Sequence, residues 1–556
     1  MTRRRERPAV PASDPLLRVR DLSVTHAGSA HPSPRNVSFD VHPGEVVLVL
    51  GPSGSGKSTL TLTLNGLIPQ SVTAEVAGRV ETAGMDARVT PVAELSRHIS
   101  MVFQDPDSQL VTGTVLDEVA FGLENLLLPV DEVLTRSEQA LRRMGLWHKR
   151  SWNPDLLSGG GRQRLAIACA LAMRSRVIVL DEPTANLDPQ GIDDVYDALG
   201  ELAHDADRAI VLVEHNLDAA MRFATRAVVL DHDGRVVLDG PARDTIRNNA
   251  DALLELGVWL PSSTLAALRL RAAGADIPVL PVTPDEFAHL PDGLFPAPAQ
   301  MPRADAPSAI TVRDMTVLKR REPVLMVPQL QIPEGSFTAI VGANGAGKTT
   351  LLQALAGVVP APRRTVMIGD LDAGRAAPRQ LASRVGFVFQ NPEHQFIAET
   401  VREELAHGLR MQRLPATEID ERVDGMLARF GLMHKADVHP FLLSGGEKRR
   451  LSVGTALIAR PGVLALDEPT FGQDRARATE LLTLLKELQA EGTTVLIVTH
   501  DLQLVAEYST HTVMLRDGAL HAAGRTAGLF ADPTVFAAAG LRLPPMLRVL
   551  AEGRAA

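Results

Sequence analysis

The chain has 556 residues, of which 45% are hydrophobic and 22% charged, a composition typical of globular proteins with sizeable cores. The formal net charge of -9 argues against a protein that binds nucleic-acid phosphates through a basic face. The single cysteine, Cys169, excludes an intramolecular disulfide, and we find no apolar run long enough to predict a transmembrane helix.

The start of the chain predicts a tail and then a phosphate-binding loop. Residues 1–13 are basic without a following apolar segment, so we expect a disordered tail rather than a secretory signal. A first domain is expected over residues 14–250. Within it, residues 45–50 indicate a buried strand that leads into a glycine-rich loop and a helix beginning near Lys57. The expected nucleotide-binding residues of this loop are Gly51, Pro52, Ser53, Gly54, Ser55, Gly56, Lys57, Ser58 and Thr59.

The chemistry of this loop follows from its residue types. Glycines let the backbone N–H groups approach phosphate oxygens, and the helix N-terminus favours negative charge. We expect Lys57 to reach the β- and γ-phosphates of a nucleotide and Ser58 to hold Mg²⁺.

A Ser-Gly-Gly segment predicts a second phosphate contact. Ser158 is suited to cap a helix, and Gly159 and Gly160 leave the first N–H groups of that helix open. An ordinary helix cap is the simpler alternative, but the fixed spacing to the acidic pair that follows favours a phosphate clamp.

Two strand ends carry the predicted hydrolytic groups. The apolar residues 176–180 end in Asp181, expected to bind Mg²⁺, and Glu182, expected to act as general base on the attacking water. His215 ends the strand over residues 209–215 and is expected to contact the γ-phosphate, although a lone histidine at a strand end is more often structural.

The first half closes with two further segments. Residues 251–276 indicate a helical extension. Residues 277–308 are expected to form an extended linker, because they contain Pro278, Pro281, Pro284, Pro291, Pro296, Pro298, Pro302 and Pro307.

The second half repeats the first, with a domain expected over residues 309–530 and a helical extension over 531–556. The same number of residues separates Gln104 from Gln390, Ser158 from Ser444 and Asp181 from Asp467. The repeated site residues are Gly342, Ala343, Asn344, Gly345, Ala346, Gly347, Lys348, Thr349, Thr350, Gln390, Ser444, Gly445, Gly446, Asp467, Glu468 and His500.

These motifs, in this order and twice over, resemble the ABC ATPases across nearly the whole chain. The resemblance implies two α/β P-loop domains in tandem, each with a mostly parallel central sheet, an antiparallel β subdomain and a helical subdomain that carries the Ser-Gly-Gly signature. It implies hydrolysis of ATP with Mg²⁺, and it adds Gln104 and Gln390 as catalytic and metal-contacting residues. It also marks Asp188 and Asp474 as the aspartates of the loop after the acidic pair.

The family further implies a head-to-tail pairing of the two domains within the chain. In that pairing the signature Ser444, Gly445 and Gly446 covers the loop of Lys57, and the signature of the first half covers the loop of Lys348.

The residues after each glutamine carry a finer resemblance. The segments Gln104-Asp-Pro-Asp-Ser-Gln109 and Gln390-Asn-Pro-Glu-His-Gln395, with the helices that follow them, look like the ATPases of energy-coupling factor (ECF) importers of vitamins or transition-metal ions. This implies a membrane coupling (T) protein and a membrane substrate-binding (S) protein as partners, no nucleic acid, and a peripheral location at the cytoplasmic face of the membrane. The acidic Asp117, Glu118, Glu403 and Glu404 are then expected to form the docking surfaces, although solvated helix charges are the simpler alternative.

Some residues depart from the family, and other functions stay open. Where many members stack adenine on an aromatic residue, the first half offers His26, and Gly161 replaces a side chain usual in the signature. Alternatives are a soluble tandem ATPase acting on ribosomes or nucleic acid, and the ATPase of another importer, such as one for sugars. The proline-rich linker and the acidic net charge disfavour the first, and the intact residues of both halves disfavour the second. The sequence names no transported substrate.

Overall fold

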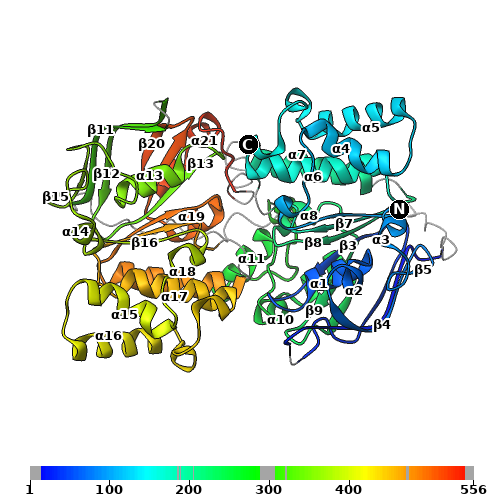
Figure 1. Cartoon of the computed structure of the whole chain (residues 1–556), viewed down its shortest axis with the longest axis horizontal. Helices are drawn as coiled ribbons and strands as arrows, with labels where there is room; N and C mark the ends of the chain where they lie inside the picture. The colour runs from blue at the N-terminus through cyan, green and yellow to red at the C-terminus, as the bar shows by residue number, and fades with distance from the viewer. Residues whose placement is uncertain are drawn as a thin grey trace. The chain divides into compact units, whose positions relative to one another are not determined.

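The computed structural model describes residues 14–29, 31–184, 187, 189–203, 206–288, 307–319, 322–470, 475–544 and 547. The chain divides into two compact units, Met1–Phe295 and Pro296–Ala556 (Figure 1). The division falls within the predicted linker. Both units are α/β with a mostly parallel sheet, as predicted. Among the described residues, no helix is both long and apolar enough to cross a bilayer.

The first unit contains two sheets. A four-stranded antiparallel sheet has the order β2 (Val37–Val41), β1 (Leu17–His26), β4 (Ala74–Thr82), β5 (Met85–Asp86). A six-stranded sheet has the order β10 (Val236–Pro241), β9 (Arg226–Leu230), β3 (Val46–Leu50), β8 (Ala209–Val213), β7 (Val177–Asp181), β6 (Ile99–Val102). Its neighbours from β9 to β6 are parallel, and only β10 runs antiparallel to β9. Strands β3, β7 and β8 are buried along their whole length, which explains their unbroken apolar sequences.

The helices of the first unit connect these strands. Helices α4, α5 and α6 pack on one another as a helical subdomain (Figure 1). The helices of this unit are α1 (Lys57–Leu64), α2 (Leu67–Gln70), α3 (Val92–Leu95), α4 (Val115–Asn125), α5 (Val130–Arg143), α6 (Gly159–Met173), α7 (Pro189–Ala203), α8 (Leu217–Ala220), α9 (Ala242–Asn248), α10 (Ala250–Glu255), α11 (Ser262–Ala272) and α12 (Pro284–Ala288).

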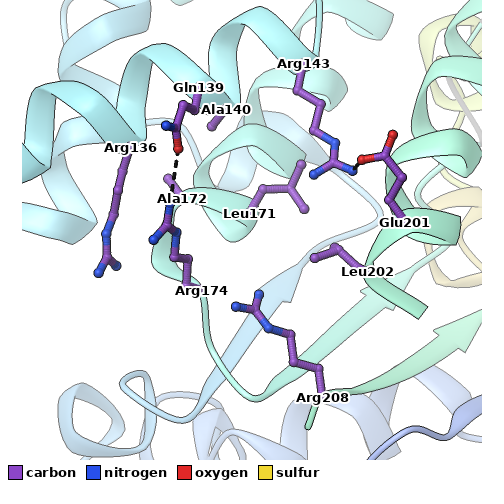
Figure 2. A pocket seen from close by; sticks show the side chains of 10 residues that line it. All are labelled: Arg136, Gln139, Ala140, Arg143, Leu171, Ala172, Arg174, Glu201, Leu202 and Arg208. Carbon is purple, nitrogen blue, oxygen red and sulfur yellow. Dashed lines mark hydrogen bonds and ion pairs between the residues drawn. The ribbon is translucent and has the colours of Figure 1, made fainter. Parts of the chain in front are cut away.

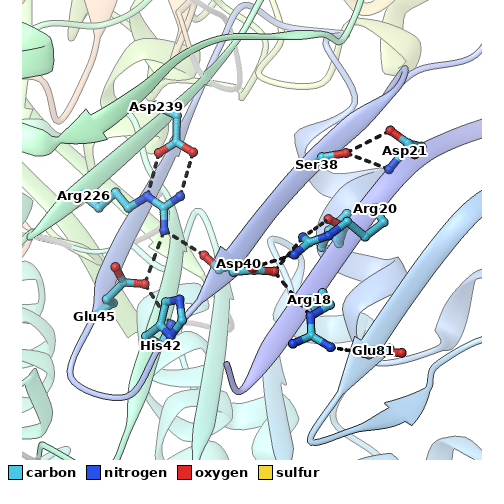
Figure 3. A network of polar contacts seen from close by, with 11 residues as sticks. Arg18, Arg20, Asp21, Ser38, Asp40, His42, Glu45, Glu81, Arg226 and Asp239 are labelled. Carbon is cyan, nitrogen blue, oxygen red and sulfur yellow. Dashed lines mark hydrogen bonds and ion pairs between the residues drawn. The ribbon is translucent and has the colours of Figure 1, made fainter. Parts of the chain in front are cut away.

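An ion-pair network ties the two sheets of the first unit together (Figure 3). Arg226 of β9 forms a two-pronged pair with Asp239 at 2.6 and 2.7 Å, and donates to the backbone oxygen of Asp40 in β2 at 2.8 Å. The Asp40 carboxylate in turn accepts two hydrogen bonds from Arg20, which hold the pKa of that carboxyl below its usual range. The antiparallel sheet is thereby fixed against β9, the neighbour of β3.

The second unit repeats this arrangement within one continuous sheet. Its strand order is β15 (Leu371–Asp372), β14 (Val366–Ile368), β11 (Ser308–Lys319), β12 (Glu322–Pro333), β20 (Ala519–Arg525), β19 (His511–Arg516), β13 (Phe337–Gly342), β18 (Thr494–Val498), β17 (Val463–Asp467), β16 (Val385–Val388). The two parts of the sheet join where Met326 of β12 pairs with Ala519 of β20. The helices are α13 (Lys348–Leu355), α14 (Pro378–Ala382), α15 (Val401–Met411), α16 (Ala416–Arg429), α17 (Gly445–Leu457), α18 (Arg475–Ala490), α19 (Leu502–Tyr508), α20 (Thr526–Phe530) and α21 (Pro533–Ala538).

The start of the predicted linker differs from the expectation of extended chain. Residues 277–288 are packed on the first unit, and Phe287 in α12 is fully buried. Thr264 donates to the backbone oxygen of Pro281 at 2.7 Å, and Arg247 pairs with Glu286 at 2.8 Å. Proline content alone therefore placed the beginning of the linker too early.

Candidate functional site

The glycine-rich loop of the first unit joins β3 to α1, as the sequence predicts. Gly56 caps α1 with a positive φ of 87°, and a Cβ there would lie 2.4 Å from the backbone nitrogen of Pro34. Only glycine fits that position. The buried Lys57 folds over the loop and donates from Nζ to the backbone oxygens of Gly51 and Pro52, both at 2.8 Å.

The loop of the second unit has the same form. Gly347 caps α13 with a φ of 93°, and Lys348 donates from Nζ to Gly342 at 2.9 Å and Ala343 at 3.1 Å. A Cβ at Gly342 would lie 2.5 Å from the backbone oxygen of Leu515. In both units the lysine ammonium is therefore held over the loop by backbone oxygens of the loop itself.

Each loop faces a buried aspartate, Asp181 at the end of β7 or Asp467 at the end of β17, on the second strand along from the strand that leads into the loop. Thr349 donates to Asp467 at 3.1 Å, and Ser58 hydrogen-bonds Asp181 in the same way. Burial raises the pKa of both aspartates to about 6. Asp181 Oδ1 is buried and has no hydrogen-bond partner among the described residues. Burial destabilises the ionised form of each carboxylate. A divalent cation bound by the carboxylate and the neighbouring hydroxyl would offset that cost.

Glu182 and His215 meet at the carboxyl ends of β7 and β8. The two oxygens of Glu182 contact different partners: Oε2 accepts from Gln104 Nε2 at 2.8 Å, and Oε1 lies 2.9 Å from His215 Nε2. Burial alone would raise the pKa of Glu182, but His215 and Lys57 outweigh it, so the pKa lies below its ordinary value. The structure thus brings Glu182 and His215, expected from their places at strand ends, together with Gln104, expected from the family resemblance.

The second unit pairs the corresponding residues with a different ring nitrogen. His500 approaches Glu468 Oε2 through Nδ1, at 3.0 Å. Burial lowers the pKa of His500, but Glu468 outweighs it and the pKa is raised. Both glutamates have an unusual backbone, with φ of 48° at Glu182 and 46° at Glu468. Each is anchored there by its own N–H, which donates to Val213 or Val498 on the next strand.

The second glutamine is held by a residue that sequence reasoning missed. Arg449 of α17 is buried and donates to the backbone oxygens of Phe389 at 2.8 Å and Gln390 at 2.7 Å. Burial lowers the pKa of Arg449 to about 10. Gln163 takes this place in the first unit and donates to Phe103 at 3.5 Å.

The signature serines cap their helices, but the two caps differ. Ser158 accepts from the N–H of Gly161 at 3.2 Å. The Ser444 hydroxyl accepts a hydrogen bond from the N–H of Glu447. The Glu447 carboxylate in turn accepts one from the N–H of Ser444 at 2.8 Å. This reciprocal capping box turns the Glu447 side chain back onto its own helix. Gly161 lacks any side chain to do this, and a Cβ there would lie 3.1 Å from Leu157 Cβ.

Two of the four acids predicted to form docking surfaces are buried instead. Glu118 is 6% exposed and accepts from the N–H groups of Val111 and Thr112, at 3.0 and 2.7 Å. Glu404 is 5% exposed and accepts from Ile397 and Ala398, both at 2.8 Å. These carboxylates fasten the loop after each glutamine, and only Asp117 and Glu403 are exposed as predicted.

The same loops present apolar side chains that the sequence analysis overlooked. Val111 is 70% exposed and Ile397 is 68% exposed, and Phe121 on α4 is also exposed. An ion pair joins each loop to the signature helix: Arg162 contacts Asp107 at 2.9 Å and, in the second unit, Lys448 contacts Glu393 at 2.6 Å.

The remaining predicted positions lie beside the phosphate loop or outside the described residues. His26 Nε2 lies 3.1 Å from the hydroxyl of Thr59, which places it beside the phosphate loop. Asp188 and Asp474 lie outside the described residues. A cavity of about 310 Å³ lies elsewhere in the first unit, and Figure 2 shows Arg136, Arg143, Arg174 and Arg208 around it. None of the residues lining this cavity belongs to the motifs.

Comparisons with known proteins identify one family and several similar chains. The family model described as "ABC transporter" matches residues 34–185 and again 325–471. The chain is 37% identical to YkoD of Bacillus subtilis, whose name assigns it to HMP/thiamine import as an ATP-binding protein, over 94% of each chain. It is 36% identical to SCO2324 of Streptomyces coelicolor, named as an ABC transporter ATP-binding protein, over 96% of this chain and 97% of that one. A solved structure of CbiO1 from Clostridium perfringens, titled as part of an ABC transporter complex, is 30% identical with a TM-score of 0.38, and covers 44% of this chain and 95% of that one.

Proposed function

Because the chain belongs to the ABC transporter family of ATP-binding proteins and carries two ATPase domains, we propose that it energises an importer of the energy-coupling factor type. The observation that carries this proposal is that each half holds a complete set of lysine, aspartate, glutamate and histidine in one place. A transport ATPase with two working sites needs both sets. The name of the Bacillus subtilis relative supports import, with a vitamin or its precursor as cargo.

We assign the phosphate contacts of ATP to the two loops. Lys57 and Lys348 exchange their backbone acceptors for the β- and γ-phosphates, since a lysine already held over the loop needs little movement. The backbone N–H groups of residues 51–59 and 342–350 complete each cradle. In the proposed head-to-tail pairing, Ser158 to Gly160 and Ser444 to Gly446 close on the phosphates bound by the opposite half.

The residues beside each loop fit Mg²⁺. Ser58 with Asp181, and Thr349 with Asp467, would hold it, with Gln104 and Gln390 alongside. The described residues contain no group of three or more His, Cys, Asp or Glu arranged around a metal, which suits an ion bound chiefly by phosphates and water. Bound Mg²⁺ supplies positive charge that neutralises the phosphate oxygens.

Glu182 and Glu468 are the proposed general bases for the attacking water. A base must hold its charge at neutral pH, and the contact with His215 keeps the Glu182 carboxyl ionised. Gln104 orients the same carboxylate from the other side. His215 and His500 each contact the base and are the residues we assign to the γ-phosphate.

The loops after the two glutamines are the proposed docking surfaces for the membrane coupling protein. Exposed Val111 and Ile397 offer apolar contact, and Asp117 and Glu403 offer negative charge for a basic partner helix. Ion pairs to α6 and α17 connect each surface to a signature. In the proposed complex a substrate-binding membrane protein is the third component, and this chain lies at the cytoplasmic face of the membrane.

Isolation of the tagged chain from native membranes, with uptake of a panel of radiolabelled vitamins, tests the proposal. We expect two integral membrane proteins to co-purify and ATP-dependent uptake of one compound. The double variant Glu182→Gln and Glu468→Gln should keep the complex and abolish uptake, which separates hydrolysis from assembly. Co-purification with ribosomes, or unchanged uptake in the double variant, would contradict the proposal.

A further inference from the structure

A buried carboxylate at the end of β8 has no role in the motifs described above. Glu214 directly precedes His215 and is 4% exposed. Its Oε1 accepts a hydrogen bond from the hydroxyl of Thr184, and the hydroxyl of buried Tyr196 on α7 lies within hydrogen-bonding reach. A buried carboxylate destabilises a fold unless polar partners surround it. A contribution to the neighbouring hydrolytic site would account for this cost.

The contacts of Glu214 join the two chain segments that carry the hydrolytic pair. Thr184 lies two residues after Glu182, and Glu214 lies one residue before His215. The contact between Thr184 and Glu214 thus fixes one segment against the other, beside the 2.9 Å approach of Glu182 to His215. Tyr196 closes the cluster from α7, where its ring packs on Phe223 at 5.8 Å.

The second unit builds its pair without this cluster. Thr499 precedes His500 and is fully buried, but its hydroxyl accepts from the N–H of Asp501 at 3.0 Å, within its own loop. Leu482 occupies the place of the tyrosine on α18. The histidine contact also differs, since His500 uses Nδ1 where His215 uses Nε2.

We propose that Glu214, with Thr184 and Tyr196, is a positioning residue that aims His215 at Glu182, and that hydrolysis in the first unit depends on the ionisation of a carboxylate that the second unit lacks. This inference concerns the ATPase reaction and does not depend on which solute is transported.

The charges around Glu214 support a titration near neutral pH. Burial raises the pKa of Glu214 to about 7, against the opposing effects of Thr184, His215 and Tyr196. The titratable groups that face the cluster are His215, Glu182 and Tyr196, with Asp218 near the tyrosine. Ionised Glu214 accepts from the Thr184 hydroxyl and attracts that of Tyr196, which also donates to the backbone oxygen of Asn216 at 3.4 Å, whereas the protonated form gives up part of its acceptor capacity. The aligned arrangement is therefore favoured as the pH rises through about 7.

The experiment uses the full chain carrying Glu468→Gln, so that only the first unit hydrolyses ATP. The rate of single-turnover hydrolysis is measured at a series of pH values on both sides of neutral. The parent chain should show a rate that rises through an inflection near pH 7. Adding Glu214→Gln, which keeps the size and a hydrogen-bonding oxygen, should remove the inflection and lower the rate several-fold above it. The half-saturating ATP concentration should stay within about twofold, because no phosphate contact changes.

Two further variants make the outcome decisive. Tyr196→Phe removes a partner that lowers the pKa of Glu214, so the inflection should move to higher pH. Thr499→Ser, the matched change in the second unit, should leave the profile unchanged. An inflection that survives in Glu214→Gln, even with a lowered melting temperature, overturns the proposal and shows a purely structural role. If Glu214→Gln does not fold, an unshifted inflection in Tyr196→Phe overturns it.

Discussion

Arg449 donates a hydrogen bond to the backbone oxygen of Gln390 at 2.7 Å, from a side chain that is buried beside the second phosphate site. The first unit uses the uncharged Gln163 at the corresponding place. The two glutamine loops are therefore held with different strength, although their own sequences are closely similar.

Arg449→Gln should loosen the second glutamine loop. Backbone oxygens left without donors cost about 1–3 kcal/mol each, so we expect a lower melting temperature and a several-fold lower rate of hydrolysis, with ATP binding retained. Calorimetry and steady-state ATPase assays check both. The reciprocal Gln163→Arg tests whether the first glutamine loop can accept the same hydrogen bonds from an arginine. Equal stability of Arg449→Gln and the parent chain would contradict the structural role of Arg449.

Removal of the buried carboxylates of α4 and α15 should disorder the loops that form the proposed docking surfaces. Glu118→Ala or Glu404→Ala leaves two backbone N–H groups without an acceptor, and hydrogen bonds to a charged group contribute about 1.5–3 kcal/mol. Hydrogen exchange at residues 111–112 and 397–398 measures the effect. Asp117→Ala is the matched control, since that exposed neighbour should leave exchange in both loops unchanged.

The buried aspartate of the first unit should make stability depend on pH. Its folded pKa of about 6 exceeds the ordinary value of 3.8, so the stability contributed by the protonated form is full below pH 3.8 and is lost as the pH rises through about 6. Asp181→Asn should therefore stabilise the nucleotide-free chain more at pH 7 than at pH 5, by about 1 kcal/mol in the free energy of unfolding, with a correspondingly larger rise in melting temperature. Asp117→Asn serves as the exposed control, and a pH-independent gain would argue against a raised pKa.

A capping box can be built into the first signature. Gly161→Glu would place a carboxylate where Glu447 stands in the second unit, and replacing a helical glycine gains up to about 1 kcal/mol. The Cβ must displace Leu157 slightly, so Gly161→Ala controls for crowding without the cap. We expect Gly161→Glu to have a higher melting temperature than Gly161→Ala. We also expect it to tighten nucleotide binding only in a background that retains Lys348, such as Lys57→Ala. Equal tightening in Lys57→Ala and Lys348→Ala backgrounds would show that the signature side chain does not act across the proposed pairing.

Sequence reasoning succeeded where the determinants are local. Asp181 and His215 each follow an apolar run, Lys57 follows a glycine-rich loop after another, and parallel strands bring such ends to one edge of a sheet. The same reasoning failed for Glu118, because acids in the first turn of a helix usually face solvent and its N–H partners lie in an irregular loop. The Ser-x-x-Glu pattern from Ser444 to Glu447 does predict the capping box, so this feature could have been found from the sequence. The partners of Glu214 come from two distant segments, so no pattern in the sequence could have indicated them.

The left-handed backbone at Glu182 and Glu468 has a consequence for laboratory evolution. A glutamate disfavours that conformation, whereas asparagine and glycine adopt it readily. A library of variants screened for heat resistance alone should therefore enrich Asn or Gly at these two codons and yield proteins that bind ATP without turning it over. A screen for ATP hydrolysis should restore Glu at both.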